Sequence, residues 1–393
     1  MKRNMRANWQ IKNLGEICEV IAGQSPEGKY YNKNGDGLPF YQGKKEFTEK
    51  YIGGPTTWTT EITKEARAGD VLMSVRAPVG PVNYATERIC IGRGLAAIRA
   101  GKEIDKDFLF DFLIKHENEI VGNTGAVFNS INKTQIENII ILLPSLPTQR
   151  LIVKKLDKIF ASIEKAKENA QKNLQNAREL FESYLQGVFA KAGAGWEEKA
   201  LEEVGEITSS KRIYKREYVK DGVPFYRIKE VKELANNKKI STDLFISEKR
   251  YVEIKDVYGV PIKGDILLTA VGTIGEIYVV KKGEKFYFKD GNVLWFKGFH
   301  SVDPYYLKYV LIAFVEKIKK LSAGAAYKAL TIEKLNKHQI FVPPLSEQHA
   351  IVKKLDALAG ETKKLEAIYQ KKLADLEELK KSVLKEAFSA KGG

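Results

Sequence analysis

The sequence is poor in cysteine and histidine, the residues that build disulfide frameworks and most metal centres. Its 393 residues include two cysteines, Cys18 and Cys90, and four histidines, and no spacing among them is typical of a metal site. A disulfide framework is therefore excluded, although a single bridge between the two cysteines stays open. So little cysteine fits a reducing compartment, and we expect a cytoplasmic protein.

Long apolar runs are also missing. No run reaches the roughly 18 apolar residues that a membrane-spanning helix requires. The basic and polar stretch 1–10 is not followed by the apolar segment of a signal peptide. We therefore expect neither a membrane span nor a cleaved leader.

The motifs of common nucleotide-dependent and DNA-modifying enzymes are missing as well. The sequence contains no G-x-x-x-x-G-K-[ST] phosphate-binding loop and no Asn/Asp-Pro-Pro-aromatic motif of DNA methyltransferases. Glu253-Ile-Lys255 has the E-x-K form seen in many nucleases, but it lacks an evident acidic partner and is more simply solvated surface. The sequence therefore predicts a non-catalytic chain with no catalytic, metal or cofactor site of its own. A stand-alone enzyme with an unrecognised active site is the alternative.

Positive charge and tyrosine are abundant instead. The formal net charge is +15, and 18 residues are tyrosine. A surface of this charge attracts nucleic-acid phosphates or anionic lipid headgroups. Tyrosine favours the first partner, because it donates hydrogen bonds to phosphates and stacks on bases.

The chain contains one unit twice. Trp9 recurs as Trp196 and Lys154 as Lys353, so the offset between the copies grows from 187 to 199 residues along the chain. Such self-similarity decides the architecture. The matching segments are Trp9–Leu14 with Trp196–Leu201, Gly37–Tyr41 with Gly222–Tyr226, Gly69–Ser74 with Gly264–Thr269, Pro144–Gln149 with Pro343–Gln348, and Lys154–Asp157 with Lys353–Asp356.

Each copy changes character once, at a proline. Short β-type runs such as Val71–Val75 and Ile266–Thr269 come before Pro144 and Pro343, and residues that favour helices come after them. We expect an α+β fold with two mixed, mostly β domains separated by two long antiparallel coiled-coil helices, as a pseudo-twofold tandem repeat. The predicted parts are domain 1 at 1–145, helix 1 at 146–192, domain 2 at 193–342 and helix 2 at 343–393.

Apolar residues recur along both helices in alternating steps of three and four, which is typical of a pairing seam. The same register is kept in both copies, so we expect the seams to pair with each other. Folding of each helix onto its own domain is the alternative. The candidate helix-pairing residues are Ile152, Leu156, Ile159, Ile163 and Leu180 in the first helix and Ile351, Leu355, Leu358, Leu365, Leu376 and Leu379 in the second.

Two basic segments occupy equivalent places in both copies, one before and one directly after the Pro-Phe-Tyr motif. Such segments can supply phosphate contacts and side chains that read base edges in a major groove. Ordinary basic loops are the alternative reading. The candidate DNA-binding residues are Lys29, Tyr30, Tyr31, Lys33, Gln42, Lys44 and Lys45 in the first copy and Lys211, Arg212, Tyr214, Lys215, Arg216, Arg227 and Lys229 in the second.

Two further paired loops can face DNA or simply connect packed elements. The turns at 74–80 and 269–275 can present backbone N–H groups to a phosphate, and a Gly-Ala-x-aromatic loop precedes each helix. Their candidate DNA-binding residues are Ser74, Arg76, Asn129, Thr269, Thr273 and Lys328.

Together these motifs resemble the specificity subunit of type I restriction–modification enzymes over nearly the whole chain. The pattern is Trp-x4-Leu, Gly-x-Pro-Phe-Tyr, Gly-Asp-[VI]-Leu, Gly-Ala-x-aromatic and then Leu-Pro-x-Leu-x-x-Gln before a long helix. Leu143–Gln149 departs from the usual Pro-Leu-x-Glu-Gln, because Thr148 stands where glutamate is common, whereas Pro344–Gln348 keeps the glutamate.

The resemblance implies that each domain reads one half of a bipartite DNA target, while the helices set the gap and dock two methyltransferase subunits. Restriction and translocase subunits would join this core, and S-adenosylmethionine, ATP and Mg²⁺ would be bound only by the partners. Because Gln42–Lys45 differs from Arg227–Glu230, the target should be asymmetric. A coiled-coil protein that bridges two duplexes without reading sequence is the main alternative.

Overall fold

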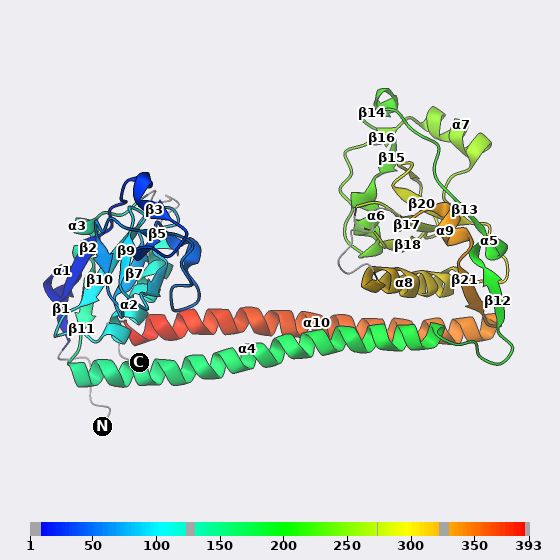
Figure 1. The fold of residues 1–393 in the computed structure, drawn as a ribbon. Helices are drawn as coiled ribbons and strands as arrows, with labels where there is room; N and C mark the ends of the chain where they lie inside the picture. The colour runs from blue at the N-terminus through cyan, green and yellow to red at the C-terminus, as the bar shows by residue number, and fades with distance from the viewer. Residues whose placement is uncertain (1–8, 123–129, 273, 322–329, 390–393) are drawn as a thin grey trace. The chain divides into compact units, whose positions relative to one another are not determined.

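The computed structural model describes residues 9–122, 130–272, 274–321 and 330–389, and it divides into two units. Unit 1 is the chain up to Gln171 together with the stretch that begins at Gln370, and unit 2 is Lys172–Tyr369. Each unit therefore contains one globular domain and one part of each long helix (Figure 1). None of the described helices is both long and apolar enough to cross a membrane.

The described residues of unit 1 form eleven short strands, three short or medium helices, the beginning of one long helix and the end of the other. These elements are β1 (Gln10–Asn13), α1 (Leu14–Ile17), β2 (Cys18–Ala22), β3 (Tyr31–Asn32), β4 (Leu38–Tyr41), β5 (Trp58–Thr59), β6 (Glu65–Ala66), β7 (Val71–Ser74), β8 (Val82–Tyr84), β9 (Ile89–Ile91), β10 (Leu95–Ala100), α2 (Lys106–Gly122), α3 (Lys133–Glu137), β11 (Ile140–Leu143) and α4 (Leu146–Phe189).

Unit 2 repeats this series with two additional helices. Its elements are β12 (Glu197–Ala200), α5 (Leu201–Val204), β13 (Glu206–Thr208), β14 (Tyr218–Val219), β15 (Val223–Tyr226), α6 (Ile228–Ala235), β16 (Phe245–Ile246), α7 (Glu248–Tyr258), β17 (Ile266–Thr269), β18 (Ile277–Val279), β19 (Tyr287–Phe288), β20 (Val293–Lys297), α8 (Pro304–Leu321), α9 (Ile332–Asn336), β21 (Gln339–Val342) and α10 (Leu345–Ala387).

Both units have the same sheet plan. An antiparallel sheet runs in the order β2-β10-β7-β8 in unit 1 and β13-β20-β17-β18 in unit 2. A second, mixed sheet runs in the order β3-β5-β4-β9-β6 in unit 1 and β14-β16-β15-β19 in unit 2, where the described residues form no counterpart of β6. Each mixed sheet contains a parallel pair, β4 with β9 or β15 with β19. A two-stranded ribbon joins β1 to β11 and β12 to β21. This shared topology confirms the tandem repeat and the predicted α+β class.

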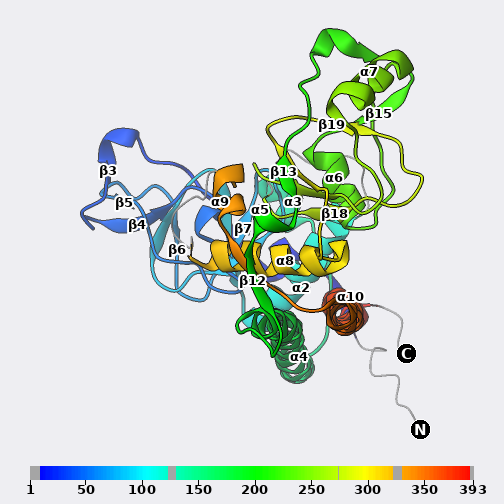
Figure 2. The same cartoon turned by 90° about the vertical axis from the view of Figure 1, so that its right-hand side faces the viewer.

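The antiparallel sheet in each unit is covered on both faces, because successive strand residues point to opposite sides. In β17, Ile266 and Leu268 pack toward α8, whereas Leu267 packs with Val231 of α6. Figure 2 shows α6 and α8 on opposite sides of this sheet. In unit 1, α2 covers the corresponding face with Phe108 and its neighbours.

The extra residues that the sequence predicts in the second copy form α7. Trp58 corresponds to Phe245 and Gly69 to Gly264, so the offset between the copies grows there from 187 to 195 residues. Helix α7 occupies this interval, and Ser247 caps its first turn by accepting a hydrogen bond from the Arg250 N–H. The added length therefore lies outside the strands that the units share.

A buried glutamine fastens the start of α4 to the domain of unit 1. The side chain of Gln149 is fully buried. Its Oε1 accepts a hydrogen bond from the Asp105 N–H at 2.7 Å, and its Nε2 donates to the carbonyls of Glu103 at 2.9 Å and Pro144 at 2.8 Å. One side chain thus satisfies three backbone groups.

Gln348 repeats this arrangement at the start of α10 in unit 2. It is also fully buried, accepts from the Asp303 N–H at 2.7 Å, and donates to the carbonyls of Ser301 at 2.9 Å and Pro343 at 2.7 Å. Since buried backbone groups need partners, this geometry explains why glutamine ends the repeated Leu-x-x-Gln motif.

The two long helices pair antiparallel within each unit. In unit 1, Glu164 contacts Lys380 at 3.0 Å and Lys167 contacts Glu377 at 2.6 Å, so three residues forward along α4 correspond to three residues backward along α10. In unit 2, Leu185 of α4 packs in one cluster with Leu355 of α10. The predicted antiparallel pairing is therefore present in both units.

The pairing seam differs from the predicted one at alternate positions. The seam positions, buried or half-buried, are Val153, Leu156, Phe160, Ile163, Lys167, Ala170, Leu174, Ala177, Phe181 and Leu185 in α4 and Val352, Leu355, Ala359, Thr362, Glu366, Tyr369, Leu373, Leu376, Lys380 and Leu384 in α10. Four predicted members are exposed instead: Ile159 at 39%, Leu180 at 62%, Leu365 at 39% and Leu379 at 47%.

This corrects the predicted register by one residue at Ile159, Leu180, Leu365 and Leu379. The seam carries charged residues such as Lys167, whose stem is covered while its ammonium group reaches Glu377. A prediction from hydrophobic periodicity does not recognise charged seam positions, and it assigns the adjacent apolar residue to the seam instead. Of the remaining candidates, Leu156, Ile163 and Leu355 are buried, and Ile152, Ile351, Leu358 and Leu376 are half-buried.

The end of the α10 segment completes the core of unit 1. Leu384 and Phe388 are buried there, and the Phe388 ring lies 4.9 Å from Phe108 and 5.9 Å from Phe112, centroid to centroid. Burying an aromatic side chain of this size stabilises a fold by about 2–3 kcal/mol. The N-terminal domain thus depends on residues from the C-terminal helix.

Asp111 introduces a pH dependence into unit 1. Burial and the nearby Asp157 carboxylate raise its pKa to about 7. Because this folded-state pKa lies above the ordinary value of 3.8, its stabilising contribution is complete at low pH and is lost as the pH rises through 7. In unit 2, Tyr309 at the equivalent place donates a hydrogen bond to Asp356 at 2.5 Å.

We expect Asp111→Asn to stabilise unit 1 at pH 8 and to have little effect at pH 4. The difference between the folded-state and ordinary pKa of Asp111 corresponds to a change in the free energy of unfolding on the order of 4 kcal/mol. Urea unfolding of both proteins at several pH values measures it, with Asp375→Asn, a change of an exposed α10 residue, as the control. Parallel pH profiles for wild type and Asp111→Asn would contradict the assignment.

Candidate nucleic-acid interface

The basic segment before β4 in unit 1 is only partly free for a ligand. Lys29 pairs with Glu27 at 2.7 Å and lies over the Tyr30 ring at 5.0 Å. Tyr31 stacks on Phe40 at 4.8 Å and donates its hydroxyl hydrogen to the Pro26 carbonyl. Its ring therefore supports the mixed sheet. Lys33 is exposed, with no ion pair among the described residues.

The equivalent segment of unit 2 contains four candidate cations. Arg212 pairs with Asp290 at 2.7 Å, and this hydrogen bond raises the pKa of the guanidinium. Lys211 lies 4.8 Å above the Tyr258 ring, and Arg216 lies 5.2 Å from the Tyr214 ring, which is 54% exposed. The remaining candidate, Lys215, is also exposed.

In unit 1, a hydrogen bond to its side chain holds the residue that follows Pro-Phe-Tyr in place. Gln42 follows β4, and its Oε1 accepts a hydrogen bond from the Ser25 hydroxyl at 2.8 Å. The Ser25 oxygen in turn accepts from the Arg93 N–H at 3.2 Å. Lys44 and Lys45 lie in the next turn, are exposed, and form no ion pair within the described ranges.

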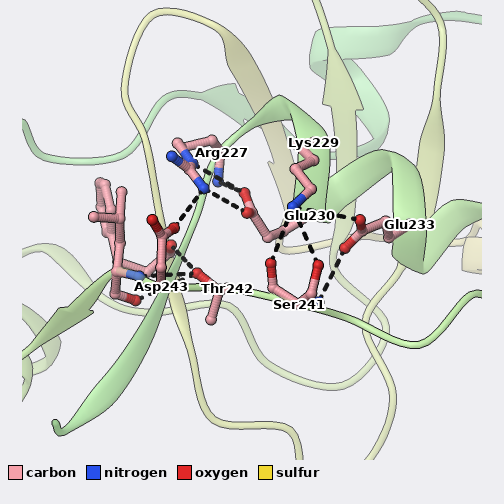
Figure 3. Close-up of polar contacts among 9 residues, drawn as sticks. Arg227, Lys229, Glu230, Glu233, Ser241, Thr242 and Asp243 are labelled. Carbon is pink, nitrogen blue, oxygen red and sulfur yellow. Dashed lines mark hydrogen bonds and ion pairs between the residues drawn. The ribbon is translucent and has the colours of Figure 1, made fainter. Parts of the chain in front are cut away.

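Arg227 has the same place in unit 2 and is held by two carboxylates (Figure 3). Its Nη2 donates to Glu230 Oε1 at 2.9 Å and to Asp243 Oδ1 at 2.8 Å, and its Nε donates to Glu230 Oε2 at 3.3 Å. Lys229 donates to the Ser241 hydroxyl at 3.1 Å.

Glu230 anchors this group from the interior. Its side chain is fully buried, and its Oε2 also accepts the Arg227 backbone N–H at 2.8 Å. Burial by itself opposes ionisation, but the hydrogen bonds from Arg227 outweigh it and lower the pKa of Glu230. The carboxylate therefore stays charged beneath the guanidinium at neutral pH.

The turn that follows β7 lies next to Gln42 in unit 1. In unit 1, the Gly94 N–H donates to the Gln42 carbonyl, and the Gly94 carbonyl accepts from the Val75 N–H, both at 3.0 Å. The Val75 carbonyl accepts from the Ile131 N–H at 2.9 Å, and in unit 2 the Ala270 carbonyl accepts from the Leu330 N–H at 3.1 Å. Backbone hydrogen bonds thus bring the paired segments together.

Ser74 and Thr269, two predicted phosphate contacts, are buried in the turns after β7 and β17. The Ser74 hydroxyl donates to the carbonyls of Arg76 and Pro78, and Thr269 Oγ1 accepts from the Glu276 N–H. These side chains shape the turns, whereas Arg76 is exposed. The other candidates of this group, Asn129, Thr273 and Lys328, lie outside the described residues.

Sequence reasoning missed the residues that position the candidates. The partners of Ser25 and Asp243 come from other parts of the chain. Glu230, in contrast, follows its partner Arg227 by three residues. A glutamate three residues after a helix start is a capping signal, and it was the one available clue. The described residues contain no group of three or more metal-ligating side chains.

A second surface lies on the long helices. Outside the seam, large apolar side chains are exposed in unit 1 at Leu151, Ile159 and Leu379. Leu151 and Ile159 line a groove of about 330 Å³ with Trp9 and Val383. In unit 2 the exposed apolar residues of the helices are Leu180, Tyr184, Leu345, Leu365 and Ile368.

Comparison with known proteins places this architecture. The family model described as "Type I restriction modification DNA specificity domain" matches residues 6–172 and 194–375. A putative type I restriction enzyme specificity subunit of Haemophilus influenzae is 29% identical over 354 residues, covering 88% of this chain and 86% of the relative. The putative MjaX specificity subunit of Methanocaldococcus jannaschii is 45% identical over 170 residues, but the match covers 42% of this chain and 40% of that relative.

Solved structures share the fold. A chain from a study of complex assembly and conformational transition in the type I restriction–modification system superposes with a TM-score of 0.78 at 20% identity, covering 97% of this chain and 98% of the other. The HsdS subunit of Thermoanaerobacter tengcongensis superposes with a TM-score of 0.61 at 20% identity, covering 97% of each chain.

Proposed function

Because the chain belongs to the family of type I restriction–modification specificity subunits, we propose that each of its two units reads one half of a bipartite DNA target. One observation carries the proposal. Both units place cationic or hydrogen-bonding side chains on the same frame, directly after the Pro-Phe-Tyr strand that pairs in parallel with β9 or β19. DNA readers need such a frame, because phosphate contacts fix the register and base contacts specify the sequence.

The two half-sites differ in this proposal. Gln42, Lys44 and Lys45 in unit 1 correspond to Arg227, Lys229 and Glu230 in unit 2. Glutamine at the first of these positions favours the edge of adenine in the major groove, whereas arginine favours the edge of guanine. The full target is therefore asymmetric.

The long helices set the gap between the half-sites and dock the methyltransferase subunits. Helix α4 has 44 residues, which corresponds to a length of about 66 Å. The exposed apolar residues outside the seam supply the docking surface, since large apolar patches typically mark interaction sites.

The chain directs its partner subunits to the DNA target, and the partner subunits catalyse the reactions. S-adenosylmethionine is bound by the two methyltransferase subunits, and ATP and Mg²⁺ are bound by restriction and translocase subunits. In this division of labour the basic side chains of the specificity chain contact double-stranded DNA, and none of its groups reacts with the substrate.

Co-expression with a type I methyltransferase subunit tests the proposal. The two proteins should co-purify, and mapping of methylated adenines in genomic DNA should return one bipartite, asymmetric motif with a fixed gap. The methyltransferase expressed alone is the control and should leave no such motif. Random or absent methylation by the purified complex would contradict sequence-specific reading and favour a DNA-bridging role.

A further inference from the structure

Arg227 is charge-compensated, unlike a side chain that binds phosphate. The group shown in Figure 3 contains the cations Arg227 and Lys229 and the carboxylates Glu230, Glu233 and Asp243. Its formal charge is therefore −1 at neutral pH. A phosphate gains little at such a place, because the carboxylates repel it as strongly as the cations attract it.

The Arg227 guanidinium nevertheless has donors that make no hydrogen bond to the described residues. Glu230 and Asp243 occupy Nη2 and Nε of Arg227, and no acceptor among the described residues bonds to Nη1. The side chain is 36% exposed. The free Nη1 carries two N–H groups in the plane that the carboxylates fix. Arg227 therefore offers directional donors with little net attraction for anions.

Fixation of this kind favours readout of a base edge. A free arginine loses side-chain entropy when it is immobilised, and a preorganised one has already lost it. In the major groove, guanine is the base that presents two acceptors, O6 and N7, and no donor at its edge. Gln42 shows the same principle in unit 1, because Ser25 holds its side-chain oxygen although the residue is exposed.

We propose that Glu230 and Asp243 are positioning residues that hold Arg227 toward one guanine in the half-site read by unit 2. This inference rests on the proposed function, since it assigns one base to one of its two readers. Lys44 and Lys45 form no such ion pairs within the described ranges and suit phosphate contacts instead.

The test maps adenine methylation by the co-expressed complex of this chain and its methyltransferase. With Arg227→Ala, we expect one guanine position in one half of the motif to become degenerate, with a loss of discrimination of about 5- to 150-fold. The other half-site should stay fixed. Arg88→Ala, which removes an exposed arginine paired with Glu65 in unit 1, is the control and should leave the motif unchanged.

Glu230→Gln separates positioning from folding. It keeps the size of the side chain and weakens its hold on the guanidinium, so it should relax the same position to a smaller extent. Arg227→Lys should not restore the guanine, because an ammonium group cannot bridge two carboxylates in one plane. If Arg227→Ala lowers the Tm by more than a few degrees, Glu230→Gln and Asp243→Asn decide the question.

Three outcomes overturn the inference. An unchanged motif in Arg227→Ala, an even loss of methylation at all sites as for a phosphate contact, or a wild-type half-site without guanine each count against it. A wild-type complex with no bipartite motif counts against the proposed function instead, so the two failures are distinguishable.

Discussion

Replacing Gln348 by leucine is expected to lower the free energy of unfolding of unit 2 by about 3–5 kcal/mol. Leucine fills a similar volume, but the Asp303 N–H and the carbonyls of Ser301 and Pro343 lose their partner in a buried place. For a unit of this size the Tm should fall by about 10 °C. Thermal unfolding followed by circular dichroism measures the change.

Gln370→Leu is the matched control for this prediction. Gln370 is a glutamine of the same helix, α10, but it is exposed, so its replacement should change the Tm by no more than a degree or two. Hydrogen exchange should localise the effect of Gln348→Leu to the start of α10 and to α8. Equal Tm values for the two variants would show that the three hydrogen bonds contribute little.

Removing one heptad from each long helix is expected to shorten the gap of the DNA target by about three base pairs. Deletion of residues 170–176 together with 368–374 keeps the seam in step, because both helices lose seven residues around their mutual contacts. Seven helical residues span about 10.5 Å, and one base pair spans about 3.4 Å. Mapping of methylated adenines by the variant complex gives the new gap.

A deletion of seven residues from α4 alone is the control for the spacer experiment. It leaves α10 with an unmatched heptad, so the seam is disrupted and methylation should be lost rather than shifted. Both half-sites should keep their sequences in the double deletion, since the domains are untouched. A double-deletion variant that methylates the original motif with the original gap would contradict the spacer role of the helices.

The repeat and the fold class could be predicted because they leave marks along the chain itself. Identical tetrapeptides at Lys154 and Lys353 identify the repeat, and the predicted strand Ile266–Thr269 agrees with β17 residue for residue. Helix α4 begins at Leu146 and α10 at Leu345, whereas the predicted helices begin at 146 and 343. Local periodicity and turn residues are sufficient for decisions of this kind.

The seam and the interface could not be read fully because they depend on partners distant in sequence. Lys167 belongs to the seam only because Glu377 lies opposite to it. Arg227 is a candidate because it is a basic residue after the Pro-Phe-Tyr motif, but Asp243, which compensates its charge, comes from the next loop. Periodicity and composition contain no information on such pairings, so the chemical state of a candidate cation emerges only from the fold.

The dependence of unit 1 on α10 gives the chain an order of assembly during synthesis. A ribosome produces the first globular domain early, but Leu384 and Phe388, which fill its core, are made only after the whole of unit 2. Until then the apolar surface around Phe108 and Phe112 has no cover from α10. A transcript broken in the second half therefore yields a product whose first half is incompletely packed and open to proteases. The domain that is synthesised first is therefore the one whose core is completed last.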